Sequence, residues 1–246
     1  MKYTSKLILN WEEYQFAAPS RWRQPWVNTI AYYPLDSVNT VNDMSWNWYD
    51  LTLIWTADFN TYQWVDCFNS QWTWRMECSS LTLADIWNVF SAMAWVYTPD
   101  RQDHNERWIL WATDNSLWFK WFDLFESYYS WQNQAYRWET LWSSNKSIFV
   151  DEPFWQWYHL CLTYEDWTNN QKLYINGVLE WEDTNTMYLS SSAIFRVAAR
   201  VWVNGSWWVD VIRSWWLSNI ILEDKVRTAQ EITDYFNQTK SLYGIS

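Results

Sequence analysis

The chain has almost no glycine with which to build turns, and it has a great excess of tryptophan. Its 246 residues include 3 glycines and 27 tryptophans, whereas glycine alone ordinarily makes up roughly 7% of a protein. Glycine adopts positive φ without steric cost, so tight turns depend on it. The chain nevertheless contains many segments rich in Asp, Asn and Ser, which are typical of turns. Any compact fold of this chain must therefore turn where glycine is missing.

Many of the tryptophans stand in these turn-like segments. The stretch DMSWNWYDLT, residues 43–52, has Trp46 and Trp48 at the two positions that would ordinarily take glycine. Five more lie in the short segments QWTW (71–74), EDWTNN (165–170) and SWW (206–208): Trp72, Trp74, Trp167, Trp207 and Trp208. Writing glycine at these positions restores ordinary loop sequences such as YEDGTNN. Tryptophan at positive φ would instead cost roughly 1–2 kcal/mol per site.

We therefore hypothesise that most of these tryptophans are glycines in the natural protein. Some bacterial lineages read the codon UGA as glycine, whereas a common alternative genetic code reads it as tryptophan. The competing interpretation is a truly tryptophan-rich protein with a sugar-stacking surface. Three tryptophans fit strand patterns and are expected to be genuine, buried between the sheets or beneath the terminal segment: Trp95, Trp157 and Trp216. The turn tryptophans should be exposed, and several should have positive φ.

Net charge excludes two classes of partner. The formal charge is −11, which argues against sequence-independent nucleic-acid binding and against attraction to an anionic membrane. The sequence has no run of 18 apolar residues, so it predicts no membrane insertion, and we identify no signal peptide at its start. Residues 1–25 are irregular and polar, with breaks at Pro19 and Pro25, and are interpreted as an N-terminal extension.

Short strand-like runs fill most of the chain after residue 28. The expected strands are residues 29–35, 49–53, 62–68, 75–83, 89–98, 107–112, 117–125, 157–164, 171–176, 178–182, 193–199 and 216–224. Asn176 and Gly177 separate two alternating runs, which predicts a hairpin with a two-residue type I′ turn. Many strands with little helix indicate an all-β domain.

One helix is expected near the end of the chain, over residues 228–238. Thr228 and Glu231 have the spacing of a capping box. Ile232, Tyr235 and Phe236 then form an apolar stripe at helical spacing, which should pack against the outside of the sheets.

Six segments in order resemble the laminin G-like jelly rolls of the concanavalin A-like lectin and glucanase superfamily. They are AYYPLDS (31–37), DMSWNWYDLT (43–52), VDCFNS (65–70), MAWVYT (93–98), WYHLCLTYEDWTNNQKLYINGVLE (157–180) and WLSNIILEDKVRTAQEITDYFN (216–237). The departures from the family pattern are mainly tryptophans where the family has glycine: Trp46, Trp48, Trp167 and Trp215. The resemblance implies a two-sheet antiparallel jelly-roll sandwich with one short C-terminal helix, spanning residues 26–246.

The resemblance also implies a non-catalytic recognition or adhesion module that is extracellular or on the cell surface and binds a glycan or a surface protein. A glycoside hydrolase on the same fold and a structural domain of a pilin-like surface protein are the alternatives. A retaining hydrolase needs two carboxylates about 5–5.5 Å apart, and no E-x-D-x-x-E segment occurs. Glu180, Glu182 and Asp183 are interpreted as a solvated strand edge.

Few residues suggest other chemistry. His104 lies in a polar loop, and His159 is on a strand where the family has His, which predicts a structural hydrogen bond. Relatives often hold a structural Ca²⁺ near the first loop, so Asp36 and Asp43 are its candidate ligands; the alternative is that both stabilise turns.

The three cysteines have no spacing that suits zinc. Cys161 is expected to be a small buried side chain in a strand. Cys67 and Cys78 would face each other, and could form a disulfide, if their strands paired as a hairpin.

Overall fold

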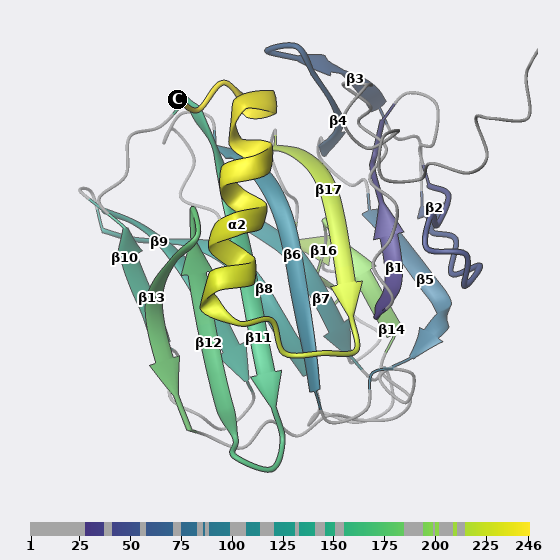
Figure 1. Ribbon diagram of the computed structural model, residues 1–246. Helices are drawn as coiled ribbons and strands as arrows, with labels where there is room; N and C mark the ends of the chain where they lie inside the picture. The colour runs from purple at the N-terminus through teal and green to yellow at the C-terminus, as the bar shows by residue number, and fades with distance from the viewer. Residues whose placement is uncertain are drawn as a thin grey trace, which may run out of the picture.

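The computed structural model describes residues 28–36, 41–54, 58–70, 75–82, 86, 89–98, 107–113, 121–130, 133–140, 146–150, 155–184, 194–198, 200–201, 209–210 and 215–246. Two antiparallel sheets lie one behind the other, and helix α2 crosses the outer face of the front sheet (Figure 1). The predicted all-β sandwich with a short C-terminal helix is confirmed. The proposed N-terminal extension, residues 1–25, lies outside the described part of the chain.

The front sheet has eight strands in the order β13-β12-β11-β6-β17-β4-β3, with β1 pairing to β17. Its strands are β1 (Thr29–Tyr33), β3 (Asp58–Tyr62), β4 (Val65–Ser70), β6 (Val89–Thr98), β11 (Gln156–Glu165), β12 (Asn170–Ile175), β13 (Val178–Asp183) and β17 (Trp215–Glu223). Its centre is built by β6, β11 and β17, which are far apart in the sequence.

The rear sheet has seven strands in the order β10-β9-β8-β7-β14-β5-β2. They are β2 (Thr52–Ile54), β5 (Arg75–Thr82), β7 (Arg107–Thr113), β8 (Trp121–Ser130), β9 (Asn133–Thr140), β10 (Lys146–Val150) and β14 (Ile194–Val197). A separate short ladder joins β15 (Arg200–Val201) to β16 (Val209–Asp210).

Strand β11 shows how the front sheet is buried on both faces. Tyr158, Leu160 and Leu162 belong to the core between the sheets. The alternate residues Trp157 and Cys161 lie in two smaller clusters on the outer face, since successive side chains of a strand point to opposite faces. These outer-face residues are shielded from solvent because α2 and the residues after it cover them (Figure 1).

Helix α2 (Ala229–Thr239) begins and docks as the sequence predicts. The hydroxyl of Thr228 accepts a hydrogen bond from the Glu231 backbone N–H, and the Glu231 carboxylate accepts one from the Thr228 backbone N–H. Ile232 and Tyr235 are buried against the sheet, and Phe236 packs partly buried beside them. A 3₁₀ turn, η2 (Lys240–Tyr243), follows and places Tyr243 over the same face.

The predicted Asn176-Gly177 turn is also confirmed. Both residues have positive φ, at 52° and 81°, and they join the antiparallel pair β12 and β13. This turn packs against the helix, because the Gly177 carbonyl accepts a hydrogen bond from the Thr233 hydroxyl at 2.8 Å. A Cβ at Gly177 would lie 3.2 Å from the Phe236 Cβ, so the site needs glycine both for its φ and for its close approach.

Some strand predictions were wrong. The expected strand 62–68 is a hairpin, in which Gln63 and Trp64 separate β3 from β4. Strands β9 and β10 were not predicted: the polar sequence of β9 lacks a clear apolar alternation, and β10 is a run of only five residues. Within the described residues, no helix is long and apolar enough to cross a bilayer.

Candidate functional site

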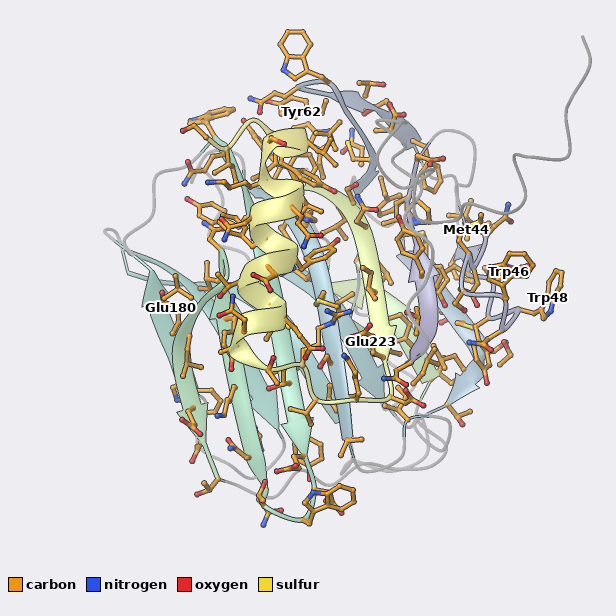
Figure 2. The ribbon with its side chains drawn as sticks, viewed as in Figure 1. Met44, Trp46, Trp48, Tyr62, Glu180 and Glu223 are labelled. Carbon is orange, nitrogen blue, oxygen red and sulfur yellow. The ribbon has the colours of Figure 1, made fainter. Side chains whose placement is uncertain are left out.

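The loop before β2 holds the tryptophans that are hardest to explain as tryptophan. Trp46 and Trp48 have φ values of 77° and 63°, and their side chains are 74% and 80% exposed. Both rings extend from one side of the molecule into solvent (Figure 2). This confirms the prediction that they lie in a turn, exposed and at positive φ.

The same loop is organised by Asp43, one of the two candidate calcium ligands. Its Oδ1 accepts hydrogen bonds from the backbone N–H groups of Tyr32 (2.9 Å) and Ser45 (2.8 Å). Its Oδ2 accepts from the Ser45 hydroxyl (2.7 Å) and the Tyr49 N–H (3.0 Å). The four donors therefore occupy the roughly four lone-pair positions of this carboxylate. This is the arrangement of an Asp that stabilises a turn, and not that of a cation ligand.

Asp36, the other candidate calcium ligand, is buried at the end of β1. Among the residues that the structure describes, no group of three or more His, Cys, Asp or Glu side chains is placed to hold a metal ion. Calcium at Asp36 and Asp43 stays a prediction.

Two further tryptophans at positive φ had no distinguishing signal in the sequence. Trp64 has φ 69° and is 84% exposed, and Trp155 has φ 68° and is 56% exposed. Trp167 is 69% exposed in its turn, as predicted, but the positive φ of that turn falls on Asn169 instead. Trp72, Trp74, Trp207 and Trp208 lie outside the described residues.

The three tryptophans expected to be genuine differ from the turn tryptophans in burial and in backbone conformation. Trp95 and Trp157 are fully buried on the outer face of the front sheet, beneath the C-terminal segment and not between the sheets. Trp95 stacks on Tyr243 with ring centroids 3.8 Å apart and planes 8° from parallel. Trp216 belongs to the same cluster but is only partly buried. None of the three has positive φ.

Trp216 takes part in what we call the aromatic surface, formed by Tyr62, Gln63, Tyr97 and Trp216. The rings of Tyr62 and Trp216 stack at 3.9 Å with an interplanar angle of 18°. Tyr97 meets both rings edge-on, at 4.7 Å and 5.3 Å. Tyr62 and Trp216 are partly exposed, whereas Tyr97 is buried beneath them. Figure 2 places Tyr62 at the end of the molecule where α2 finishes.

Hydrogen bonds hold the polar groups of this surface in place. The Tyr62 hydroxyl donates to the Tyr97 hydroxyl oxygen at 3.1 Å, and the Gln63 amide nitrogen donates to the same oxygen at 3.2 Å. Burial raises the pKa of the Tyr97 hydroxyl, so it stays protonated. Gln63 is exposed. Fixed aromatic rings bordered by hydroxyl and amide groups are suited to contact both the apolar and the polar parts of a small ligand.

His159 is buried but does not make the predicted structural hydrogen bond. Neither ring nitrogen has a hydrogen-bond partner among the described residues, and the ring packs against Trp95, Tyr235 and Phe236. Burial, with a smaller contribution from the Arg227 charge, lowers the pKa of His159 to about 3. The imidazole is therefore neutral near pH 7 and is part of the packing beneath α2.

The cysteine prediction was wrong for the pair and right for Cys161. Cys67, Cys78 and Cys161 are all buried, and none of the three forms a disulfide. Cys67 lies on β4 in the outer cluster of the front sheet, whereas Cys78 lies on β5 in the core between the sheets. The two strands belong to different sheets and do not form a hairpin, so the thiols do not face each other.

The acidic residues after the Asn-Gly turn lie on an edge strand, as predicted. β13 is the last strand of the front sheet, and Glu180 and Glu182 are exposed on it (Figure 2 labels Glu180). Glu182 pairs with Lys172 at 3.1 Å, and this hydrogen-bonded contact lowers the pKa of Glu182. This arrangement is that of a solvated edge.

No protein-family model and no curated protein matches the sequence. Solved structures do match the fold. Domain 4 of AbnA, an extracellular arabinanase from Geobacillus stearothermophilus in complex with arabinotriose, is 18% identical with a TM-score of 0.64, over 84% of this chain and 97% of that chain.

Two botulinum neurotoxin structures also match. The type C neurotoxin, whose cell entry is dependent upon interaction with two ganglioside molecules, is 13% identical with a TM-score of 0.61, over 86% and 51% of the two chains. The binding domain of neurotoxin DC in complex with SialylT is 13% identical with a TM-score of 0.64, over 86% and 52%. This chain thus spans about half the length of those chains.

The shared architecture defines the class of fold: a two-sheet antiparallel jelly-roll sandwich. At these identities the likeness shows the fold alone.

Proposed function

We propose that this chain is a non-catalytic carbohydrate-recognition module of the laminin G-like type. The observation that carries the proposal is the aromatic surface, where two partly exposed stacked rings are bordered by a hydroxyl and an amide. Sugars have both apolar C–H faces and hydroxyl groups, and such a surface can contact both. A surface protein is the second class of partner that the resemblance implies.

The structural neighbours support a binding role outside the cell. The arabinanase domain, an extracellular enzyme's domain, is in complex with arabinotriose, and the neurotoxin DC binding domain is in complex with SialylT. Carrying this setting over to the present chain, we place it outside the cell or on the cell surface.

The binding proposal is tested by exposing the full chain to a panel of neutral and sialylated glycans and measuring retention. We expect saturable binding to at least one glycan. A chain that is folded, as judged by circular dichroism, yet binds no glycan on the panel would contradict the proposal.

The hydrolase alternative is tested separately, by incubating the chain with common β-glucans and measuring reducing ends. We expect no release of sugar, because the acidic groups on β13 form a solvated edge. Turnover that a single Glu→Gln change abolishes would overturn the non-catalytic assignment.

Structural calcium at Asp36 and Asp43 is a further proposal, tested by comparing the melting temperature with added Ca²⁺ and with chelator. A calcium site predicts a lower melting temperature in chelator. The four hydrogen bonds to Asp43 support the other outcome, an unchanged melting temperature with Asp43 acting as a turn former.

We further propose that the exposed turn tryptophans are glycines in the natural protein. Trp46, Trp48, Trp64 and Trp155 all have φ between 63° and 77° and exposed rings. Bulky residues rarely adopt this conformation, whereas glycine adopts it freely. The buried Trp95 and Trp157 lack positive φ, and so does the exposed turn residue Trp167, so backbone geometry supports the proposal at these four positions and not at Trp167.

A further inference from the structure

We propose that Trp216, Tyr62 and Gln63 form a subsite that binds one uncharged sugar ring. The proposal rests on the proposed carbohydrate-recognition function and assigns its site and its class of ligand. It is carried by the juxtaposition of three segments, the tip of the β3–β4 hairpin, the end of β6 and the start of β17.

The structure first separates tryptophans that can serve as a binding platform from those that cannot. Trp46, Trp48 and Trp155 stand in loops and turns at positive φ, with rings largely in solvent, so they are poorly placed to hold a ligand ring. Trp216 instead lies within β17, paired to Asn69 of β4 and Tyr97 of β6. A platform needs a ring that is fixed by packing and still partly open, and Trp216 meets both conditions.

The packing around Trp216 makes the platform rigid. Its ring stacks on Tyr62 and meets the edge of the buried Tyr97. Tyr97 in turn meets the edge of the buried Trp157, which packs on Tyr243 of η2. The three edge-on contacts, with ring centroids 5.3, 5.6 and 5.1 Å apart, lie in the range of favourable aromatic pairs. The exposed rings therefore keep one orientation, which lowers the entropy that a ligand loses on binding.

The polar groups at the rim match the hydroxyls of a sugar. The Tyr62 hydroxyl and the Gln63 amide nitrogen each donate a hydrogen bond to the Tyr97 hydroxyl oxygen. The Tyr62 oxygen keeps lone pairs, and the Gln63 carbonyl oxygen is an acceptor on an exposed residue. Two acceptors beside an aromatic ring suit a ligand that carries O–H donors.

The surrounding charges favour an uncharged sugar. None of the contacts that the structure gives for Tyr62, Gln63 or Trp216 within its described residues involves Lys or Arg. Recognition of a carboxylate or sulfate ordinarily uses such cations. The net charge of −11 further disfavours an anionic ligand.

The hairpin tip connects this site to the identity of residue 64. Trp64 directly follows Gln63 at φ 69° and is 84% exposed. With glycine at this position, no tryptophan side chain would follow Gln63 at the hairpin tip. The platform itself would be unchanged, because Trp216 is its tryptophan.

Isothermal titration of the full chain tests the proposal with arabinotriose, cellotriose and lactose as neutral probes and 3′-sialyllactose as the charged probe. We expect at least one neutral probe to bind, and Trp216→Ala and Gln63→Ala each to weaken that binding, Trp216→Ala by about tenfold or more. Trp167→Gly is the matched control, because it removes an exposed tryptophan from the β11–β12 turn, which lies at the opposite end of β6 and β11 from Tyr97. It should bind with unchanged affinity.

The outcomes separate the site from the function. Gln63 is exposed, so its replacement leaves the fold intact and keeps the test valid even where Trp216→Ala lowers the melting temperature. Unchanged affinity in both variants would overturn this site while leaving carbohydrate recognition standing. Tighter binding of 3′-sialyllactose than of every neutral probe would overturn the ligand class. If no probe bound the folded chain, both this proposal and the proposed function would fail.

Discussion

Residue 64 shows how the backbone reveals where a glycine belongs. Gln63 and Trp64 are the two central residues of the hairpin between Tyr62 and Val65, with φ values of 45° and 69°. A two-residue turn of this kind needs positive φ at both positions, and its second position is typically glycine. A tryptophan there is strained and leaves its ring in water.

The strain at residue 64 predicts a gain in stability from Trp64→Gly. Relief of the left-handed conformation should raise the free energy of unfolding by about 1 kcal/mol, measured by urea denaturation. Trp167→Gly provides the control, because Trp167 is also largely exposed, at 69% against 84% for Trp64, but has no positive φ. An equal gain in both variants would show that exposure, and not φ, is responsible.

His159 predicts a particular dependence of stability on pH. Its folded-state pKa of about 3 lies below the ordinary value of 6.5 because the ring is buried. Below pH 6.5 the unfolded chain takes up a proton that the folded chain refuses, so this contribution to stability is complete above pH 6.5 and falls as the pH drops toward 3. The loss approaches about 1.4 kcal/mol per pH unit.

The measurement is urea denaturation between pH 7 and pH 4, for the chain with the given sequence and for its His159→Leu variant. In the variant, the free energy of unfolding should fall less steeply with decreasing pH, because the contribution of one titrating proton is removed. This holds whatever the absolute stability of the variant. Parallel curves for the two proteins would show that His159 takes up its proton at the same pH in the folded and the unfolded chain, and would contradict the lowered pKa.

At the scale of elements, the junction between β17 and α2 depends on one buried ion pair. Arg227 donates from Nε and Nη2 to the two carboxylate oxygens of Glu223, and both side chains are buried (Figure 2 labels Glu223). The Ser91 hydroxyl accepts from the Arg227 backbone N–H at 2.8 Å and donates to the Lys225 carbonyl at 2.7 Å. These contacts fix the connection that brings α2 back over the sheet.

Breaking this pair from one side should be costly. Arg227→Met leaves the Glu223 carboxylate buried without its partner, which should lower the free energy of unfolding by about 3–5 kcal/mol. The double variant Glu223→Leu with Arg227→Met should recover much of the loss, because no uncompensated charge is left. Equal losses in the single and double variants would contradict this account of the junction.

The elements that were predictable from the sequence are those specified by local patterns. β6 and β11 follow from alternating apolar residues, α2 from its capping box and stripe, and the β12–β13 turn from Asn176-Gly177. The β3–β4 turn was missed because tryptophan stands where a glycine would have marked it. Polar β9 was missed because neither face of its sequence is uniformly apolar.

The aromatic surface could not be predicted from the sequence, because its residues come from three separate segments. Tyr62, Tyr97 and Trp216 meet only when β17 pairs with both β4 and β6. That pairing is a property of the sheet order, which local patterns do not specify. The buried state of His159 was predictable from its strand, but its lack of a hydrogen-bond partner depends on the aromatic residues of α2 above it.

At the scale of the whole molecule, the sandwich has several non-glycine turn residues at positive φ, and its outer face carries a fixed aromatic cluster. The core between the sheets and the cluster beneath α2 contain apolar residues in regular strand positions. Among the described residues, the four tryptophans with positive φ all lie at exposed positions. This distribution is expected from misread glycine codons, which fall wherever the natural chain has glycine, and not from selection for tryptophan.

The central claim is tested most directly by fragmentation mass spectrometry of one tryptic peptide from the protein purified from its natural source. Trypsin cleavage after Lys146 and after Lys172 releases residues 147–172, which contain no other Lys or Arg. This peptide contains Trp155, Trp157 and Trp167. Trp155 has positive φ, Trp157 is buried, and Trp167 lies in an exposed turn. We predict glycine at 155 and 167 and tryptophan at 157 in this peptide. Tryptophan at all three positions would show that the protein is truly tryptophan-rich and that its turns accept the strain.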